Sequence, residues 1–192
     1  MKFEVESYDI SEVTHTSDYI IDSSHTHVGF KIPHLIIANI NGIFKKFEGK
    51  ILYNKKSGQL LALSGEIDAA SIDTNNEKRD QHLKGAEFLN VQKFPTIKFG
   101  NGSSIRQSKW CSSVDGRLTI KDYTRPVNLN VLCKGCRTDT SGNEILVFEI
   151  RTTINKNDFG IFWNRKLSAR ENLIGDIVSI NIEGEAKRIN AV

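Results

Sequence analysis

Apolar and polar residues alternate, one by one, along much of this chain. Within residues 25–34, Val28, Phe30 and Ile32 share one parity, and the residues between them are glycine or lysine. Successive side chains of a β-strand point to opposite faces, so the pattern predicts a strand with one apolar face. Equivalent strands are predicted at residues 44–53, 60–69, 96–99, 114–120, 127–133, 146–154 and 178–182.

About eight short strands of this kind leave two architectures, a β-sandwich or a closed antiparallel barrel. With 192 residues, of which 39% are hydrophobic, the chain has the right size for one packed domain. The alternation alone does not choose between the two architectures. Turn-forming residues between the strands predict turns at positions 56–58, 101–102, 115–116 and 139–143.

One short helix interrupts the strands. Thr74 and Glu77 are spaced as a capping box, in which Thr74 is the N-cap and Glu77 lies three residues later. Gly85 stands where helices commonly end. We therefore expect a helix over about residues 74–84 and a helical turn near residues 86–90, placed as a lid over an open end of the fold.

Six segments resemble the signature of the YceI-like family. The most specific is SIDTNNEKRDQHLKGAEFLNVQKFPTIKF, residues 71–99, and the whole resemblance runs from Tyr19 to about Ala186. The other five segments are YIIDSSHTHVGFKIPHL, GIFKKFEG, GRLTIKDYTRPV, INKNDFGIFWN and GDIVSINIEGEA.

This resemblance implies an all-β fold, an eight-stranded antiparallel barrel of the lipocalin-like type with its helix at the barrel mouth. The barrel would occupy residues 19–188, after an N-terminal extension of residues 1–18. Members of the family are associated with long isoprenoid or fatty-chain ligands. The resemblance therefore implies a barrel that binds such a ligand and that transports or stores it.

Arg79, Asp80 and His82 lie within about one helical turn. His82 is three residues after Arg79, so both side chains can reach one ligand head group. The arginine fork suits a phosphate or a carboxylate at the polar end of the ligand. In the structural alternative, Arg79 and Asp80 tie the helix to the barrel rim by ion pairs.

The aromatic residues of the strands have two interpretations. Phe30, Phe44, Phe99 and Phe148 either fill a core or line an elongated apolar cavity. Parity does not separate these alternatives, and the family resemblance favours the cavity. The complete set of predicted ligand-binding residues is Arg79, His82, Asp80, His25, His34, Phe30, Phe44, Phe88, Phe99, Asp158, Phe159 and Trp163.

Neither the histidines nor the cysteines form a convincing metal site. His25 and His27 share one face of their strand, and His34 has the opposite parity. Cys133 and Cys136 have a C-x-x-C spacing, but in an extended strand they point to opposite faces unless Gly135 makes a tight turn. We therefore expect no metal and no cofactor, and we interpret Cys133 as a small buried hydrophobe.

Composition limits the partners and the compartment. The net charge of +3 is too small and too scattered to indicate nucleic-acid binding. No apolar run approaches the ~18 residues of a membrane span, and the N-terminal residues lack the apolar core of a secretory signal. The sequence as given therefore predicts the cytoplasm, and the periplasm would apply to a processed form. Exposed edges or rim surfaces would allow a homodimer.

Two other functions stay open at this point. The first is an enzyme or accessory factor that acts on an isoprenoid or quinone intermediate, with His82 and Asp80 as acid–base groups. The second is a thiol or metal protein built on Cys133 and Cys136. No phosphate-binding loop, serine elbow or zinc-protease helix occurs, so we do not expect catalysis.

Overall fold

Eight strands close into an antiparallel barrel in the computed structural model, which describes residues 15–34, 38–108, 111–164 and 173–189. Each strand pairs with the next, and the last, β11, pairs back with the first, β1. The predicted eight-stranded barrel is thereby confirmed. Its strands are β1 (Thr16–Ile21), β4 (Phe47–Asn54), β5 (Gln59–Asp68), β7 (Thr96–Gln107), β8 (Cys111–Ile120), β9 (Tyr123–Thr138), β10 (Glu144–Asn155) and β11 (Ile177–Arg188).

Three further strands extend the barrel wall at one end. β2 (His27–His34) pairs with β11, β3 (Ala38–Phe44) pairs with β2, and β6 (Ile72–Asp73) pairs with β3. β11 pairs with β1 near its end and with β2 nearer its start. β1 and β2 therefore act as two halves of one wall strand, separated by a turn.

The strand predicted at residues 44–53 is confirmed from Phe47 onward as β4, but Phe44 ends β3, because the chain breaks between the two strands. The backbone N–H of Lys45 donates to the carbonyl of Ser71, and the N–H of Lys46 donates to the Ser71 hydroxyl. These two bonds take the place of ladder bonds, so a new strand starts at Phe47.

The turns predicted at residues 101–102 and 115–116 are also wrong. Both pairs lie inside strands, and the β7–β8 register shifts between Asn101 and Ser104. Gly116 pairs with Asn101 on one side and with Val127 on the other. The Phe99 ring covers it, and a Cβ at Gly116 would lie 2.4 Å from Phe99 Cζ. The glycine thus makes room for an aromatic ring.

The remaining two turns agree with prediction. Gly58 has a φ of 74°, a left-handed conformation that glycine adopts without strain. The Asp139 carboxylate accepts hydrogen bonds from the backbone N–H groups of Ser141 and Asn143, as a turn-forming aspartate does.

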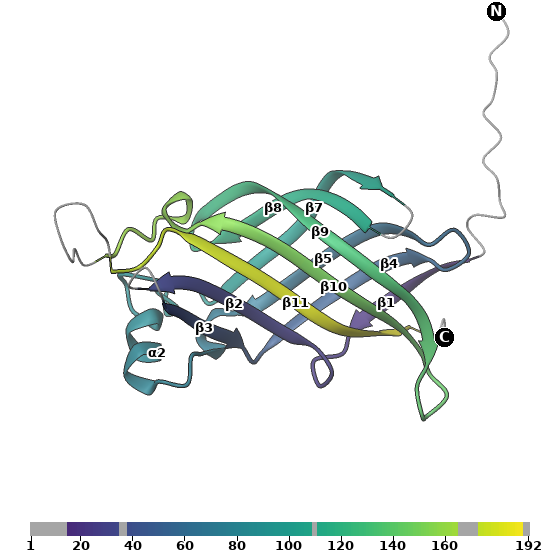
Figure 1. Ribbon diagram of the computed structural model, residues 1–192, viewed down its shortest axis with the longest axis horizontal. Coiled ribbons are helices and arrows are strands. Elements are labelled where there is room, and N and C mark those ends of the chain that lie inside the picture. Colours follow the sequence, from purple (N-terminus) through teal and green to yellow (C-terminus); the bar gives the residue numbers. More distant parts are fainter. Residues whose placement is uncertain (1–14, 35–37, 109–110, 165–172, 190–192) are drawn as a thin grey trace, which may run out of the picture.

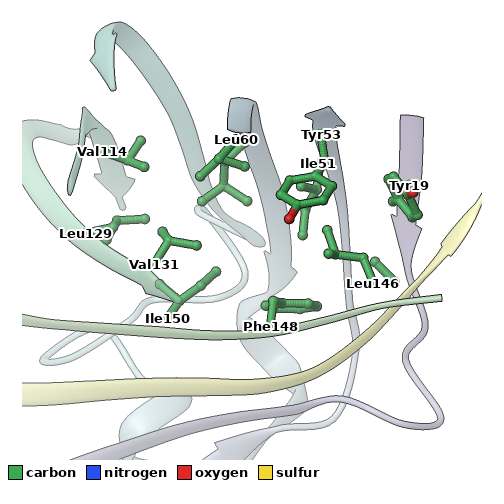
Figure 2. Packing of buried hydrophobic residues seen from close by; sticks show 12 residues of the cluster. Tyr19, Ile51, Tyr53, Leu60, Val114, Leu129, Val131, Leu146, Phe148 and Ile150 are labelled. Carbon is green, nitrogen blue, oxygen red and sulfur yellow. The ribbon is translucent and has the colours of Figure 1, made fainter. Parts of the chain in front are cut away.

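The buried side chains form two clusters. The first, which we call the closed-end cluster, fills the barrel at the end where β1 begins and β11 ends (Figure 1), and its side chains meet across the interior (Figure 2). The closed-end cluster comprises Tyr19, Ile51, Tyr53, Leu60, Leu63, Val114, Leu129, Val131, Leu146, Phe148, Ile150 and Ala186. The second, the mouth cluster, comprises Ala69, Ile72, Phe88, Leu89, Ile97, Leu118, Ile120, Phe159 and Ile161.

The helix α2 (Glu77–Lys84) lies at the end of the barrel opposite the termini (Figure 1). Its N-cap is Asn76, whose side chain accepts a hydrogen bond from the N–H of Arg79. The predicted N-cap, Thr74, is wrong because its hydroxyl is engaged with Asp80 and Arg79. Two 3-10 turns, η1 (Ala69–Ser71) and η2 (Lys156–Phe159), complete the described helical segments.

The contact between Phe99 and Gly116 generates a stability prediction. Gly116→Ala should lower the free energy of unfolding by about 1–3 kcal/mol, because the added methyl overpacks against the ring. Gly100→Ala is the matched control on the neighbouring strand, where a Cβ meets nothing within 4 Å, and should stay within about 0.5 kcal/mol of the parent. Chemical denaturation measures both, and equal losses would contradict the packing described.

Candidate functional site

The barrel is hollow at the end that carries α2. A cavity of about 390 Å³ lies there, inside the ring of strands. Inward-facing side chains of nearly every wall strand line it, among them Phe30 of β2, Phe44 of β3 and Ile97 of β7. Apolar side chains make up almost all of this wall.

The floor of the cavity is the closed-end cluster. Leu129 and Ile150 belong to that cluster and also line the cavity. Phe148 lies one inward position behind Ile150 on β10 and is 1% exposed. The cavity therefore ends against packed side chains and does not run through the barrel.

Hydrogen bonds to Thr74 hold the start of α2 against the wall. The carboxylate of Asp80 accepts bonds from the backbone N–H and the hydroxyl of Thr74. The Arg79 guanidinium donates through Nε to the Thr74 hydroxyl, and through Nη2 to the Thr74 carbonyl, at 2.7 Å each. Asp80 and Arg79 thus meet on one residue, in place of the ion pairs considered from the sequence.

His82 lies at the cavity mouth within an aromatic group. Its ring meets those of Phe88 and Trp163 edge-on, with centroids 4.9 and 5.1 Å away. Its Nε2 lies 2.8 Å from a carboxylate oxygen of Glu87. The hydrogen-bonded imidazole of His82 and the guanidinium of Arg79 therefore lie at the rim of an otherwise apolar cavity.

Lys156 is a cavity residue that the sequence interpretation missed. It is only 4% exposed. Its ammonium donates to the carbonyls of Ile161 and Trp163 and forms an ion pair with Asp176 at 3.2 Å. A signal was present, because Lys156 continues the inward parity of Ile150 and Ile154.

Most of the predicted ligand-binding residues meet at this cavity. The predicted residues that line it are Phe30, His34, Phe44, Arg79, His82, Phe88, Phe99, Phe159 and Trp163. The other three lie elsewhere: Asp80 faces Thr74, Asp158 is exposed on η2, and His25 lies in the turn between β1 and β2. His82 and Asp80 therefore do not face each other as an acid–base pair.

His25 belongs to a local ion cluster centred on Asp22. Hydrogen bonds from Lys187, then Ser24 and His25, hold the pKa of Asp22 well below its usual range. Asp22 in turn raises the pKa of His25. This cluster joins β1 and β2 to β11 and lies away from the cavity lining.

Cys133 and Cys136 both face the interior, as two residues three apart in a regular strand would not. The β9–β10 register shifts at this point, and Gly135 has a φ of 93°. The resulting bulge turns both thiols toward the closed-end cluster. Burial, and then the neighbouring Cys136, raises the pKa of Cys133 to about 12, so it stays protonated.

Cys136 is also protonated at neutral pH, because burial raises its pKa despite a bond to Tyr19. Its Sγ lies 3.3 Å from Tyr19 Oη, and Tyr19 donates to Glu144 at 2.6 Å. Buried, protonated thiols are weak nucleophiles and weak metal ligands. The described residues contain no group of three or more His, Cys, Asp or Glu placed to hold a metal ion.

Fold and cavity together define a hollow antiparallel barrel with an apolar chamber and a helix at its mouth. Residues 19–186 match the model of the YceI-like domain, and the chain belongs to the YceI-like family. Protein YceI of Salmonella newport is 35% identical over 147 residues, which cover 76% of this chain and 76% of that protein.

Solved structures agree with the barrel. The crystal structure of the Campylobacter jejuni YCEI protein has a TM-score of 0.71 and 29% identity, and covers 88% of this chain and 97% of that one. A polyisoprenoid binding domain from Saccharophagus degradans has a TM-score of 0.62 and 11% identity. It covers 91% of this chain and all of that domain, and shares the fold. Within the described ranges, no helix is long and apolar enough to span a bilayer.

The burial of two cysteines predicts their reactivity. Iodoacetamide at about pH 8 should label the exposed Cys111 in the native protein and leave Cys133 and Cys136 unlabelled, because their pKa values are raised by burial. Peptide mass spectrometry locates the label, and denaturant should expose all three. Native Cys111→Ser protein should take up none, and labelling of its remaining thiols at a comparable rate would overturn this assignment.

Proposed function

We propose that this barrel binds one long isoprenoid or fatty-acyl chain inside its cavity, with the polar end of the ligand at the mouth. The observation that carries the proposal is the chamber itself, deep, apolar and closed at its floor. Pockets for greasy ligands have this character, with a few polar groups that set orientation. Transport or storage of the ligand is the role that we propose for such binding.

The polar residues of the lining are few. Among the described lining residues, those with a polar group in the side chain are His34, Arg79, His82, Thr152, Lys156 and Trp163, whose indole has one N–H donor. Thr152 and Lys156 already have protein partners, since Thr152 donates to the carbonyl of Asn128 and Lys156 donates to those of Ile161 and Trp163 in the loop after η2. The wall therefore offers an incoming chain mostly apolar contacts.

Arg79 and His82 are the groups that we propose for the polar end of the ligand. The Nη1 group of Arg79 has no hydrogen-bond partner within the described residues, whereas its Nε and Nη2 are bonded to Thr74. That leaves donors for a phosphate, carboxylate or hydroxyl, and the Thr74 bonds hold the guanidinium in place. Their spacing of three residues on the predicted helix indicated the same two residues.

Burial of the chain supplies the affinity. Each buried methylene contributes about 0.8 kcal/mol, so a dozen give about 10 kcal/mol before the costs of ordering the ligand are subtracted. The polar groups at the mouth add orientation more than affinity. The polyisoprenoid binding domain from Saccharophagus degradans, which shares this fold, supports the proposal.

The proposal predicts that filling the cavity abolishes binding. Ile180 lines the cavity from β11, so Ile180→Trp should reduce the farnesol occupancy at least about tenfold by occupying the space of the chain. Native mass spectrometry of protein incubated with farnesol measures the occupancy.

Ile20→Trp is the matched control, because Ile20 is 45% exposed on β1 and does not line the cavity. It should bind as the parent does. Absence of any prenyl or fatty-chain adduct on the parent protein would sink the proposal, as would an equal loss in both variants.

A further inference from the structure

The closed-end cluster limits the length of chain that the barrel can hold. We infer that the cavity accepts a chain of about fifteen carbons and that the floor, with Ile150 at its centre, sets this limit. This inference rests on the proposed function and narrows it to one size of ligand. It separates farnesyl and palmityl chains from long polyprenyl tails.

The estimate follows from the cavity volume. An apolar cavity of about 150 Å³ holds one benzene ring, which corresponds to about 25 Å³ per carbon. The cavity here has about 390 Å³, so it holds about fifteen or sixteen carbons at that density. An octaprenyl chain has about forty carbons, which is more than twice what this cavity holds at the same density.

The depth of the cavity also limits the length of an extended chain. The cavity wall on β10 runs from Ile150 to Thr152 and Ile154, and Lys156 follows on η2. Six residues of strand cover about 20 Å, and a strand tilt of about 40° reduces this to about 15 Å along the barrel axis. A chamber this deep is short for a barrel whose strands continue well beyond it, as β10 and β11 do.

The floor of the cavity is closely packed, because its side chains are almost fully buried against one another. Ile150 is 3% exposed, and behind it Phe148 and Val131 are 1% and 0% exposed. Figure 2 shows Phe148 and Ile150 on one side of the interior, with Leu60 and Val114 on the other. A chain could advance past Ile150 only by displacing well-packed side chains, which dense interiors resist.

The two ends of the cavity differ in a way that fixes the ligand between them. The mouth carries the polar rim of Arg79 and His82, and the floor is apolar. A ligand whose head stays at the rim has only the cavity depth for its tail. Length selection therefore follows from anchoring at one end and a wall at the other.

A mixture of linear alcohols tests this inference. Equimolar dodecanol, tetradecanol, hexadecanol, octadecanol and eicosanol compete for the protein, and native mass spectrometry resolves each complex by mass. Occupancy should rise several-fold with each step up to hexadecanol and fall several-fold by eicosanol.

Ile150→Ala should move the peak of this profile to octadecanol, because it removes about three carbons from the floor. Leu146→Ala is the matched control. It removes the same number of carbons from the same inward row of β10, yet Leu146 does not line the cavity. Its peak should remain at hexadecanol. Ile182→Phe adds bulk at the floor and should move the peak to a shorter alcohol, which also serves if Ile150→Ala fails to fold.

An occupancy for eicosanol equal to that for hexadecanol in the parent would overturn the length limit, and so would identical profiles for Ile150→Ala and Leu146→Ala. Failure of every alcohol, and of farnesol, to bind the parent would instead overturn the proposed function. The two failures are therefore distinguishable in one set of spectra.

Discussion

The interior of an eight-stranded barrel is just wide enough to be filled by inward side chains or to hold one small ligand. This barrel is filled by side chains at one level and hollow at another level of the same strands. Tyr19, Tyr53 and Phe148 help to fill one end, and the other end keeps about 390 Å³ open behind α2. The packed side chains of the filled end stabilise the closed barrel without a ligand. The other end can therefore stay hollow, because the hydrophobic core does not depend on it alone.

Alternation predicted the strands and their inward rows well, because the period of two is a property of the backbone. The row of β10 from Leu146 to Ile154 is correct in every member. The prediction failed where other bonds compete with the ladder. The backbone N–H groups of Lys45 and Lys46 donate to Ser71, so the strand predicted from residue 44 starts only at Phe47. Hydrogen bonds between elements distant in sequence leave no trace in local periodicity.

The candidate site, like the fold, was predicted in part from the sequence. Parity and family resemblance together predicted the aromatic wall, and the helical spacing predicted the rim residues Arg79 and His82. Lys156 was not predicted, because a lysine is rarely buried unless its charge is paired, and its partners here, two carbonyls and Asp176, come from residues that local parity does not reveal. The sequence could not predict which end of the barrel is hollow, because this depends on how far the inward side chains of eight different strands reach toward one another. Likewise, the bulge at Gly135 turns the thiols of Cys133 and Cys136 to the same inner face, whereas a regular strand would place them on opposite faces.

The proposed function depends on one barrel that combines a packed floor with a chamber for the ligand. Methyl NMR of isoleucine, leucine and valine side chains during a hexadecanol titration tests this combination most directly. The methyl signals of Leu118 and Ile180, which line the cavity, should shift as the ligand binds. Those of Leu60 and Val114, in the closed-end cluster away from the cavity, should stay unchanged. Comparable shifts in both sets, or shifts confined to residues outside the barrel, would contradict it.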